Sequence, residues 1–243
     1  TLVARILDHA PALPMLRLSS LDAIEMDELL FELVTTHAWV APYLHLSLQH
    51  GDDLILKRMK RRHSRAQAIE LCGRLKAARP EIALGTDLIA GFPTEEETHF
   101  ASTLSLIEAC GLAFVHAFPF SPRAGTPAAR MPQVDRRIVK ARAARLREAS
   151  AAALARHLER WVGREAQALV EREGFARLPD FTGAIISPTP RGGGAGRRGE
   201  ALFSGSGAHA DDANTGASRR PLLPPLKLRF LSHDGSNLIG VPA

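Results

Sequence analysis

The stretch LHLSLQHGDD, residues 44–53, decides the fold because apolar and polar side chains alternate along it. In an extended strand its three leucines fall on one face, and His45, Ser47 and Gln49 fall on the other. The segments that follow, DLILKRMKRR and SRAQAIELCGRLKAARP, have helical spacing, and Ser64 with Gln67 predicts a capping box. A strand that feeds helices indicates a parallel sheet covered on one side, with its polar face turned into a barrel or half barrel.

The composition is that of an ordinary folded protein. The chain has 243 residues, of which 45% are hydrophobic and 23% charged, and no apolar run approaches the ~18 residues of a membrane span. The opening TLVARILDHAPALP lacks the parts of a signal peptide, so we expect a cytoplasmic protein without a membrane segment. Cys72 and Cys110 occupy apolar positions of predicted helices and are expected to be buried thiols, not metal ligands. The net charge of +5 favours a polyanionic partner.

Three more strand-helix units are predicted. MLRLSS predicts a strand, followed by the helix LDAIEMDELLFELV that Asp22 and Glu25 would open. IALGTDLIAGF predicts another strand, followed by a helix with a capping box of Thr94 and Glu97. LAFVHAFPFS predicts the last strand, with a return helix from about residue 135 to 161. Four such units favour part of a parallel α/β barrel, with an open doubly wound sheet as the alternative.

After Trp161 the pattern changes to short strands, in REAQALVERE, DFTGAIISP and LKLRFLSHDGSNLIGV, the last with a turn at Asp234 and Gly235. We therefore divide the chain into residues 1–160 and a small all-β module, residues 161–243. Within the module, residues 191–220 hold eight glycines in thirty positions, which predicts a disordered insert.

Four motifs stand at the carboxyl ends of the predicted strands: RLSS, LHLSLQHGDDLILKRMKRRHS, GTDLIAGFPTEE and HAFPFSPRAGTPAARMPQV. In this order they resemble the radical S-adenosylmethionine (SAM) tRNA methylthiotransferases, most closely the type that acts on N6-threonylcarbamoyladenosine. The resemblance covers residues 1 to about 160 densely, and the β module weakly as a TRAM domain. It implies the last four strand-helix units of a (β/α)6 half barrel that holds SAM across its strand ends.

The resemblance also implies the chemistry and the partners. A [4Fe-4S] cluster would reduce SAM to a 5′-deoxyadenosyl radical, a second cluster would carry sulfur, and a methylthio group would be inserted at C2 of an adenine in tRNA. A flavodoxin-type protein would supply electrons. We assign no catalytic side chain and no metal ligand in this chain, and we interpret His50 and His63 as surface histidines.

Several residues match the family motifs and are implied contacts. Those expected to bind SAM are Arg17, Ser19, Ser47, Gln49, Asp87, Ile89, Gly91, Phe92 and Ser121. Those expected to contact tRNA, or the SAM carboxylate, are Lys57, Arg61 and Arg123. The alternatives are a polar pair that caps the barrel mouth, a plain turn with a helix cap, a structural hydrogen bond of Asp87, and solvated cations.

Residues 135 to 164 contain nine Lys or Arg against three acidic residues. This surplus lies directly before the β module, and it predicts that Arg142 and Arg145 contact tRNA phosphates; a solvated helix face is the alternative.

The family's cluster cysteines have no counterpart in these 243 residues. We therefore expect the chain to be the C-terminal part of a larger enzyme whose N-terminal part it needs as a partner. The alternatives are a basic RNA-binding or SAM-binding protein without redox chemistry, and an inactive relic.

The 243-residue chain by itself is expected to perform no methylthiolation, because two cysteines 38 positions apart cannot form a three-cysteine loop for an iron-sulfur cluster. Anaerobic reconstitution with iron and sulfide should give no cluster absorbance, and SAM with dithionite should give no 5′-deoxyadenosine. Stoichiometric 5′-deoxyadenosine from the purified chain would contradict this expectation.

Overall fold

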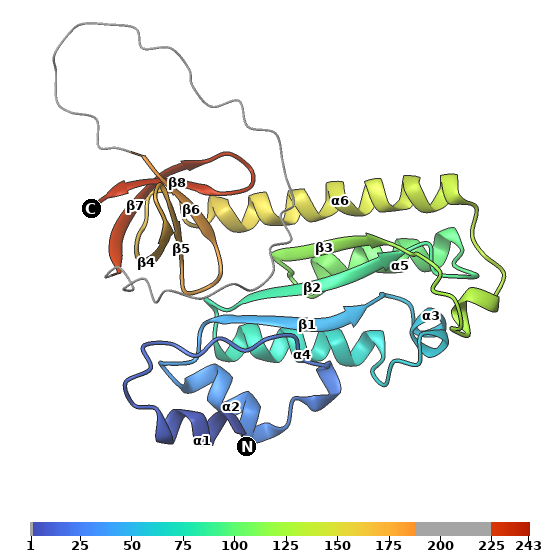
Figure 1. The fold of residues 1–243 in the computed structure, drawn as a ribbon, viewed down its shortest axis with the longest axis horizontal. Helices are drawn as coiled ribbons and strands as arrows, with labels where there is room; N and C mark the ends of the chain where they lie inside the picture. The colour runs from blue at the N-terminus through green and yellow to red at the C-terminus, as the bar shows by residue number, and fades with distance from the viewer. Residues whose placement is uncertain (1, 188–224) are drawn as a thin grey trace, which may run out of the picture.

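The structure is a computed structural model that describes residues 2–187 and 225–243. The predicted insert at residues 191–220 lies outside the described residues. Figure 1 shows a small parallel sheet with helices along it, and a β-barrel beyond the end at which the sheet strands begin. The helices are α1 (Leu2–His9), η1 (Ala23–Glu25), α2 (Glu28–Thr36), α3 (Asp53–Arg58), α4 (Arg65–Ala78), α5 (Glu97–Ala109), η2 (Ala128–Arg130) and α6 (Arg136–Glu159).

The sheet consists of β1 (Tyr43–Gln49), β2 (Ala83–Ala90) and β3 (Phe114–Pro119), all parallel and in the order β1-β2-β3. The alternation predicted for residues 44–49 is confirmed, since the side chains of Leu44, Leu46 and Leu48 are completely buried. They belong to one core with apolar residues of α4, α5 and α6. Burial of a leucine side chain contributes roughly 1.5–3 kcal/mol, so this face anchors the sheet to its helices.

Two predicted helices begin and end close to where the pattern placed them. The capping box of α4 is present, since Ser64 accepts from the Gln67 backbone and the Gln67 side chain accepts from the Ser64 backbone. Helix α6 is capped by Asp135 and ends at Glu159. In Figure 1 it runs back along the sheet from the carboxyl ends of the strands to the barrel. These caps satisfy backbone N–H groups that have no partner within a helix.

The prediction of a first strand at MLRLSS is wrong, and the sheet has three strands instead of four. Within the described residues, the backbone of this segment pairs with β1 and the residues before it only at isolated bridges, Leu16 to Val40 and Leu21 to Leu46. The sequence offset of the first pair is 24 and that of the second is 25. One additional residue on the β1 side must therefore be absorbed between the bridges, which breaks the regular ladder.

The predicted start of the next helix is also wrong. A short 3-10 turn, η1, comes first, and α2 begins only after Asp27, whose side chain accepts a hydrogen bond from the Leu30 backbone at 2.7 Å. Asp22 makes no cap, and its carboxylate lies 3.2 Å from the Arg61 guanidinium. A long-range ion pair has replaced the local hydrogen bond that the spacing predicted.

Helix α5 begins after Glu96, not at the predicted capping box of Thr94 and Glu97. Glu96 and His99 form the box instead. Thr94 has a φ of +67°, in the left-handed region, and its hydroxyl accepts from Arg58 at 2.6 Å. Thr94 is therefore part of the turn before the helix, and the N-cap is Glu96, two residues later in the chain.

The second unit is a closed barrel with the strand order β4-β5-β6-β8-β7. Its strands are β4 (Glu165–Arg172), β5 (Phe175–Arg177), β6 (Gly183–Ile186), β7 (Leu226–His233) and β8 (Leu238–Pro242). Strand β5 was not predicted, because three residues are too short for a periodic signal. The turn at Asp234 is confirmed, since its carboxylate accepts from the Ser236 and Asn237 backbones. The barrel has its own apolar core, around Phe230.

An aromatic group joins the barrel to the sheet. Tyr43, at the start of β1, stacks on Phe181 with ring centroids 4.8 Å apart, and Phe114 of β3 meets both rings edge-on. Such contacts add roughly 0.5–1.5 kcal/mol each to the burial of the rings. Within the described ranges, no helix is long and apolar enough to cross a membrane.

Gly51 and Gly73 form a matched pair for testing the packing of α5 against the end of β1. An added methyl at Gly51 meets the Ser102 carbonyl and lies 2.6 Å from the Thr103 Cα, whereas at Gly73, in α4, it meets nothing within 4 Å. We expect Gly51→Ala to lower the free energy of unfolding by ~1–3 kcal/mol, and Gly73→Ala to raise it by up to ~1 kcal/mol. Urea unfolding followed by circular dichroism measures both. Equal midpoints for the two variants would contradict the packing.

Candidate functional site

The face of the sheet opposite the helices carries rows of side chains set by the strand register. The directly paired residues are Gly85 with Phe114, Asp87 with His116, and Ile89 with Phe118. On β1 the same face presents Tyr43, His45, Ser47 and Gln49. From the barrel outward, this face is therefore first aromatic, then polar, and then mixed at the carboxyl ends of the strands.

Three adjoining hollows lie at those carboxyl ends. The central one has a volume of about 450 Å³ and is lined by Gln49, Asp87, Ile89, Ser121 and Arg123, among others. A hollow of about 300 Å³ shares Gln49 and Ile89 with it, and one of about 650 Å³ shares Ser121. Parallel α/β folds bind ligands at this edge, and the size suits a small-molecule cofactor.

Three of the polar side chains that line the central hollow are available to a ligand. Within residues 2–187 and 225–243, the side chains of Gln49, Ser121 and Arg123 make no hydrogen bond or ion pair. Gln49 has a φ of +63°, and the pairing of β1 with β2 is irregular between Leu46 and Gln49. A non-glycine residue in this region is uncommon and costs roughly 1–3 kcal/mol, which the surrounding structure has to offset.

Gly91 follows β2 and lines the largest of the three hollows. Its φ is +80°, and an added Cβ would lie 2.5 Å from a methyl group of Val139. Both the conformation and the close approach require glycine. The next residue, Phe92, is buried and contacts Phe120 edge-on, with ring centroids 5.1 Å apart.

A buried carboxylate holds this turn in place. Glu95 accepts from the Gly91 backbone at 3.0 Å, from the His50 imidazole at 3.1 Å and from the Arg142 guanidinium at 2.8 Å. The Nδ1 atom of His50 accepts from the Asp52 backbone, so Nε2 carries the proton and donates to Glu95. The network was invisible in the sequence, because its members come from three separate segments.

Two expectations are corrected by this network. His50 is not a surface histidine, since only 1% of it is exposed. Arg142 is not a free phosphate contact, because it is buried against Glu95 and Glu97, and its removal would leave a buried carboxylate without its partner.

A third expectation, that His63 lies at the surface, is also wrong. His63 is buried beside Arg61, and its burial together with that cation lowers its pKa.

The other cations predicted to contact tRNA or SAM differ in whether their side chains are already paired within the protein. Arg145 pairs with Glu97 at 2.5 Å and lowers the pKa of that carboxyl, while remaining about half exposed. Arg61 donates to the Ser47 carbonyl at 2.6 Å and pairs with Asp22, so it ties the N-terminal segment to β1. Lys57 is exposed on α3 and does not line the hollows.

The remaining predicted contacts lie away from the hollows. Arg17 sits at the opposite end of β1, with its guanidinium 4.8 Å from the ring centroid of Phe181 and 5.7 Å from that of Tyr43. Ser19 is exposed, and the Ser47 hydroxyl bonds to that of Ser20 at 2.6 Å. The structure therefore groups Gln49, Asp87 and Ser121 at the central hollow. Arg17, Ser19 and Ser47 lie away from it.

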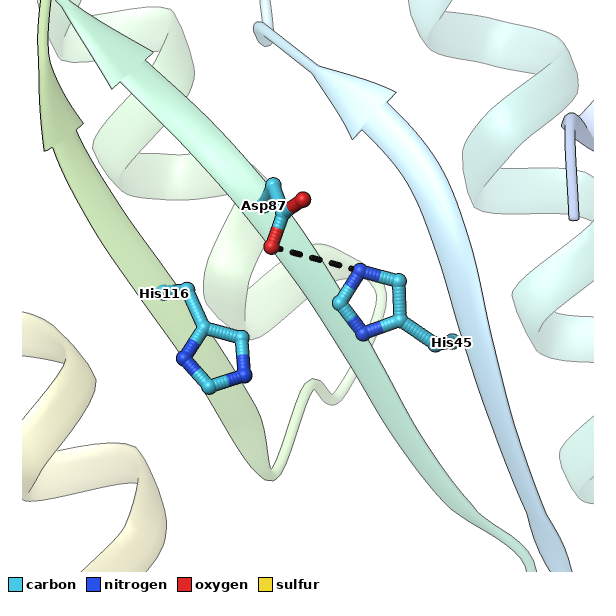
Figure 2. A group of neighbouring side chains, drawn as sticks. All are labelled: His45, Asp87 and His116. Carbon is cyan, nitrogen blue, oxygen red and sulfur yellow. Dashed lines mark ion pairs between the residues drawn. The ribbon is translucent and has the colours of Figure 1, made fainter. Parts of the chain in front are cut away.

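Two histidines that received no assignment from the sequence lie beside Asp87. His45 of β1 approaches Asp87 of β2 to 3.3 Å, and His116 of β3 completes the group (Figure 2). The rings of His45 and His116 are stacked, with centroids 5.9 Å apart. The alternation in LHLSLQ placed His45 on the polar face, but only the strand order brings His116 to it.

The chain's two thiols have a different environment. Cys72 and Cys110 are both buried in the core behind the sheet. A hydrogen bond to Cys110, together with burial, raises the pKa of the Cys72 thiol well above its usual range. Both thiols lie in the core behind the sheet, so this pair does not provide cluster ligands at the strand ends.

Comparisons with known proteins show what the chain is similar to. Residues 15–107 match the family model of the Radical SAM superfamily. Over 180 residues the chain is 46% identical to the threonylcarbamoyladenosine tRNA methylthiotransferase MtaB of Rickettsia prowazekii, covering 74% of this chain and 43% of that protein. Over 168 residues it is 40% identical to the tRNA-2-methylthio-N(6)-dimethylallyladenosine synthase of Erythrobacter litoralis, covering 68% of this chain and 37% of the relative.

A solved structure, the radical SAM enzyme coproporphyrinogen III oxidase (HemN) from Escherichia coli, matches with a TM-score of 0.41 and 15% identity, over 54% of this chain and 31% of that one. The chain spans less than half the length of the curated relatives named above. Residues 15–107 therefore match the radical SAM superfamily, and the chain is similar to the MtaB and MiaB-type tRNA methylthiotransferases.

Proposed function

We propose that this chain is part of a tRNA methylthiotransferase that inserts a methylthio group at C2 of N6-threonylcarbamoyladenosine by radical SAM chemistry. The observation that carries the proposal is the hollow at the carboxyl ends of β1, β2 and β3, lined by the side chains of Gln49 and Ser121, which have no partner among the described residues. The 46% identity to a threonylcarbamoyladenosine tRNA methylthiotransferase supports the choice of nucleoside. A tRNA substrate puts the proposed activity in the cytoplasm.

The residues of the hollow fit SAM. Gln49 and Ser121 offer neutral donors and acceptors for ribose hydroxyls and for the amino-acid end, while Ile89 and Phe92 offer an apolar wall for adenine. The turn at Gly91 lets backbone approach the ligand closely. Bound SAM supplies the methyl group and the 5′-deoxyadenosyl radical. This chain would orient SAM and keep water from it.

The thiols of this chain do not fit an iron-sulfur cluster, because both are buried in the core behind the sheet. We propose that the cluster ligands belong to a part of the enzyme that these 243 residues do not contain, and that a flavodoxin-type protein reduces it. The alternative, a SAM-binding or RNA-binding protein without redox chemistry, is favoured by the same cysteine positions. Cysteine triplets encoded in frame upstream would decide between them.

We further propose that residues 1–160 and 161–243 are separate domains and that the second is a TRAM-like module that binds RNA. The barrel has an apolar core of its own, which, among residues 2–160, only the end of α6 joins, through Leu154 and Leu158, and this supports a boundary near residue 160. For tRNA binding, the exposed cations of α6 are better placed than Arg142. Lys140 and Arg147, seven residues apart on one side of α6, are both exposed. Arg123 lines the central hollow without a side-chain partner among the described residues, and it is the proposed contact nearest the modified base.

A first prediction tests SAM binding. Replacing Gln49 by leucine keeps a similar volume but removes the amide, so we expect the dissociation constant for SAM to rise up to ~10-fold, the effect of about one hydrogen bond. Isothermal titration calorimetry of the 243-residue chain with SAM measures it. Gln167→Leu, on the exposed side of β4, is the matched control. No SAM binding by the unmodified chain, or equal affinities for the two variants, would contradict the assignment.

A second prediction concerns tRNA. If Lys140 and Arg147 each neutralise a phosphate, their joint replacement by glutamine should lower the slope of log K against log salt by ~1.8 for duplex regions. Filter binding of unmodified tRNA between low and moderate salt gives the slope. The control is Arg5→Gln with Arg74→Gln, on α1 and α4. A slope that changes equally in both double variants would exclude α6 as the contact surface.

A further inference from the structure

The most concentrated set of metal-ligating side chains in the described residues is His45, Asp87 and His116. One ligand atom from each lies within 4.8 Å of the other two. Figure 2 shows the three side chains on neighbouring strands, extending over the same face of the sheet. Two imidazoles and one carboxylate that converge in this way are a ligand set for a divalent transition metal.

The geometry of the closest pair suits a shared ion. The Nε2 atom of His45 lies 3.3 Å from the Oδ1 atom of Asp87. Two donors that each bind one Zn²⁺ at ~2.1 Å lie about 3.0–3.4 Å apart for angles of 90° to 109°. The same distance also fits a weak hydrogen bond between the two side chains. A metal titration distinguishes a bound ion from a hydrogen bond.

The backbone preorganises the group. Asp87 and His116 are directly opposite each other in the pairing of β2 with β3, and His45 pairs with Gly85, two residues before Asp87. Gly85 leaves room for the hydroxyl of Tyr43, which lies 3.5 Å from Nδ1 of His45. This second contact orients the imidazole, as outer partners of metal-bound histidines do. His116 is exposed on the edge strand, so its ring can turn toward the other two.

The surroundings are open to an ion from solvent. The exposed fraction of the side chain is 14% for His45 and 36% for Asp87. Within the described residues, His45 is the only ion-pair partner of Asp87, so no lysine or arginine competes for the carboxylate. Asp87 also lines the central hollow, which leaves coordination positions accessible from that side.

We propose that His45, Asp87 and His116 bind one divalent transition-metal ion of the Zn²⁺, Co²⁺ or Ni²⁺ class. Mg²⁺ and Ca²⁺ are excluded as the preferred ions because they favour all-oxygen ligand sets. The site is distinct from any iron-sulfur cluster, since it contains no thiolate. The proposal rests on the three side chains alone and does not assume that the chain binds SAM or tRNA.

The test is a Co²⁺ titration of the purified, chelator-treated 243-residue chain, followed by the visible absorption of bound Co²⁺. We expect one ion per chain, displaced by Zn²⁺ and unaffected by millimolar Mg²⁺. His116→Ala and Asp87→Asn should each weaken Co²⁺ binding at least ~10-fold, about 1.4 kcal/mol. No SAM or tRNA is present, so failure of the proposed function leaves this result unchanged.

His233→Ala is the matched control. His233 lies 3.0 Å from Glu159, so it is also a histidine–carboxylate pair, but it is not one of the three clustered ligands. Its loss should leave Co²⁺ affinity unchanged, and circular dichroism should show all three variants folded. No stoichiometric Co²⁺ binding, or binding that survives in folded His116→Ala and Asp87→Asn proteins, would overturn the proposal.

Discussion

The carboxylate of Glu95 is completely enclosed and accepts hydrogen bonds from the turn after β2, from the residue after β1 and from α6. A buried carboxylate is stable only when its oxygens are paired, and removing one partner from such a pair typically costs ~3–5 kcal/mol. His50, Gly91 and Arg142 therefore have to remain together. Since these three residues stand next to the hollows at the strand ends, this one requirement sets the shape of the candidate site.

The two faces of the sheet follow from a different constraint. The leucines of β1 bury their side chains against the helices, which leaves the polar side chains of the strand on the other face. At the beginning of the strands that face is closed by Tyr43, Phe114 and Phe181, with Phe181 contributed by the barrel segment. At the end of the strands it is open, and among the described residues the side chains of Gln49, Ser121 and Arg123 there have no hydrogen-bond or ion-pair partner. A ligand of this face therefore enters at the carboxyl ends.

The elements predicted most accurately are those that depend on neighbours in the sequence. The alternation in β1 and the cap of α4 by Ser64 involve residues at most three or four positions apart. The predictions that failed are those in which a residue bonds to a partner far away in the sequence and not to the neighbour that the local pattern indicated. Asp22 pairs with Arg61 and not with a helix end, and Thr94 lies in a left-handed turn that Arg58 contacts. MLRLSS has a strand pattern, but its register against β1 changes by one residue.

For the candidate site, the sequence by itself determined which residues stand at the strand ends, since alternation and the motif GFPTEE place Gln49, Ile89 and Gly91 there. Tertiary structure decided what those residues can do. It buried Arg142, turned Arg17 toward the barrel and set His116 beside Asp87. The physical reason is that a side-chain period reports which face of its own strand or helix a residue occupies. Strand order and helix packing then determine which other segment that face meets, and a local pattern contains no information about it.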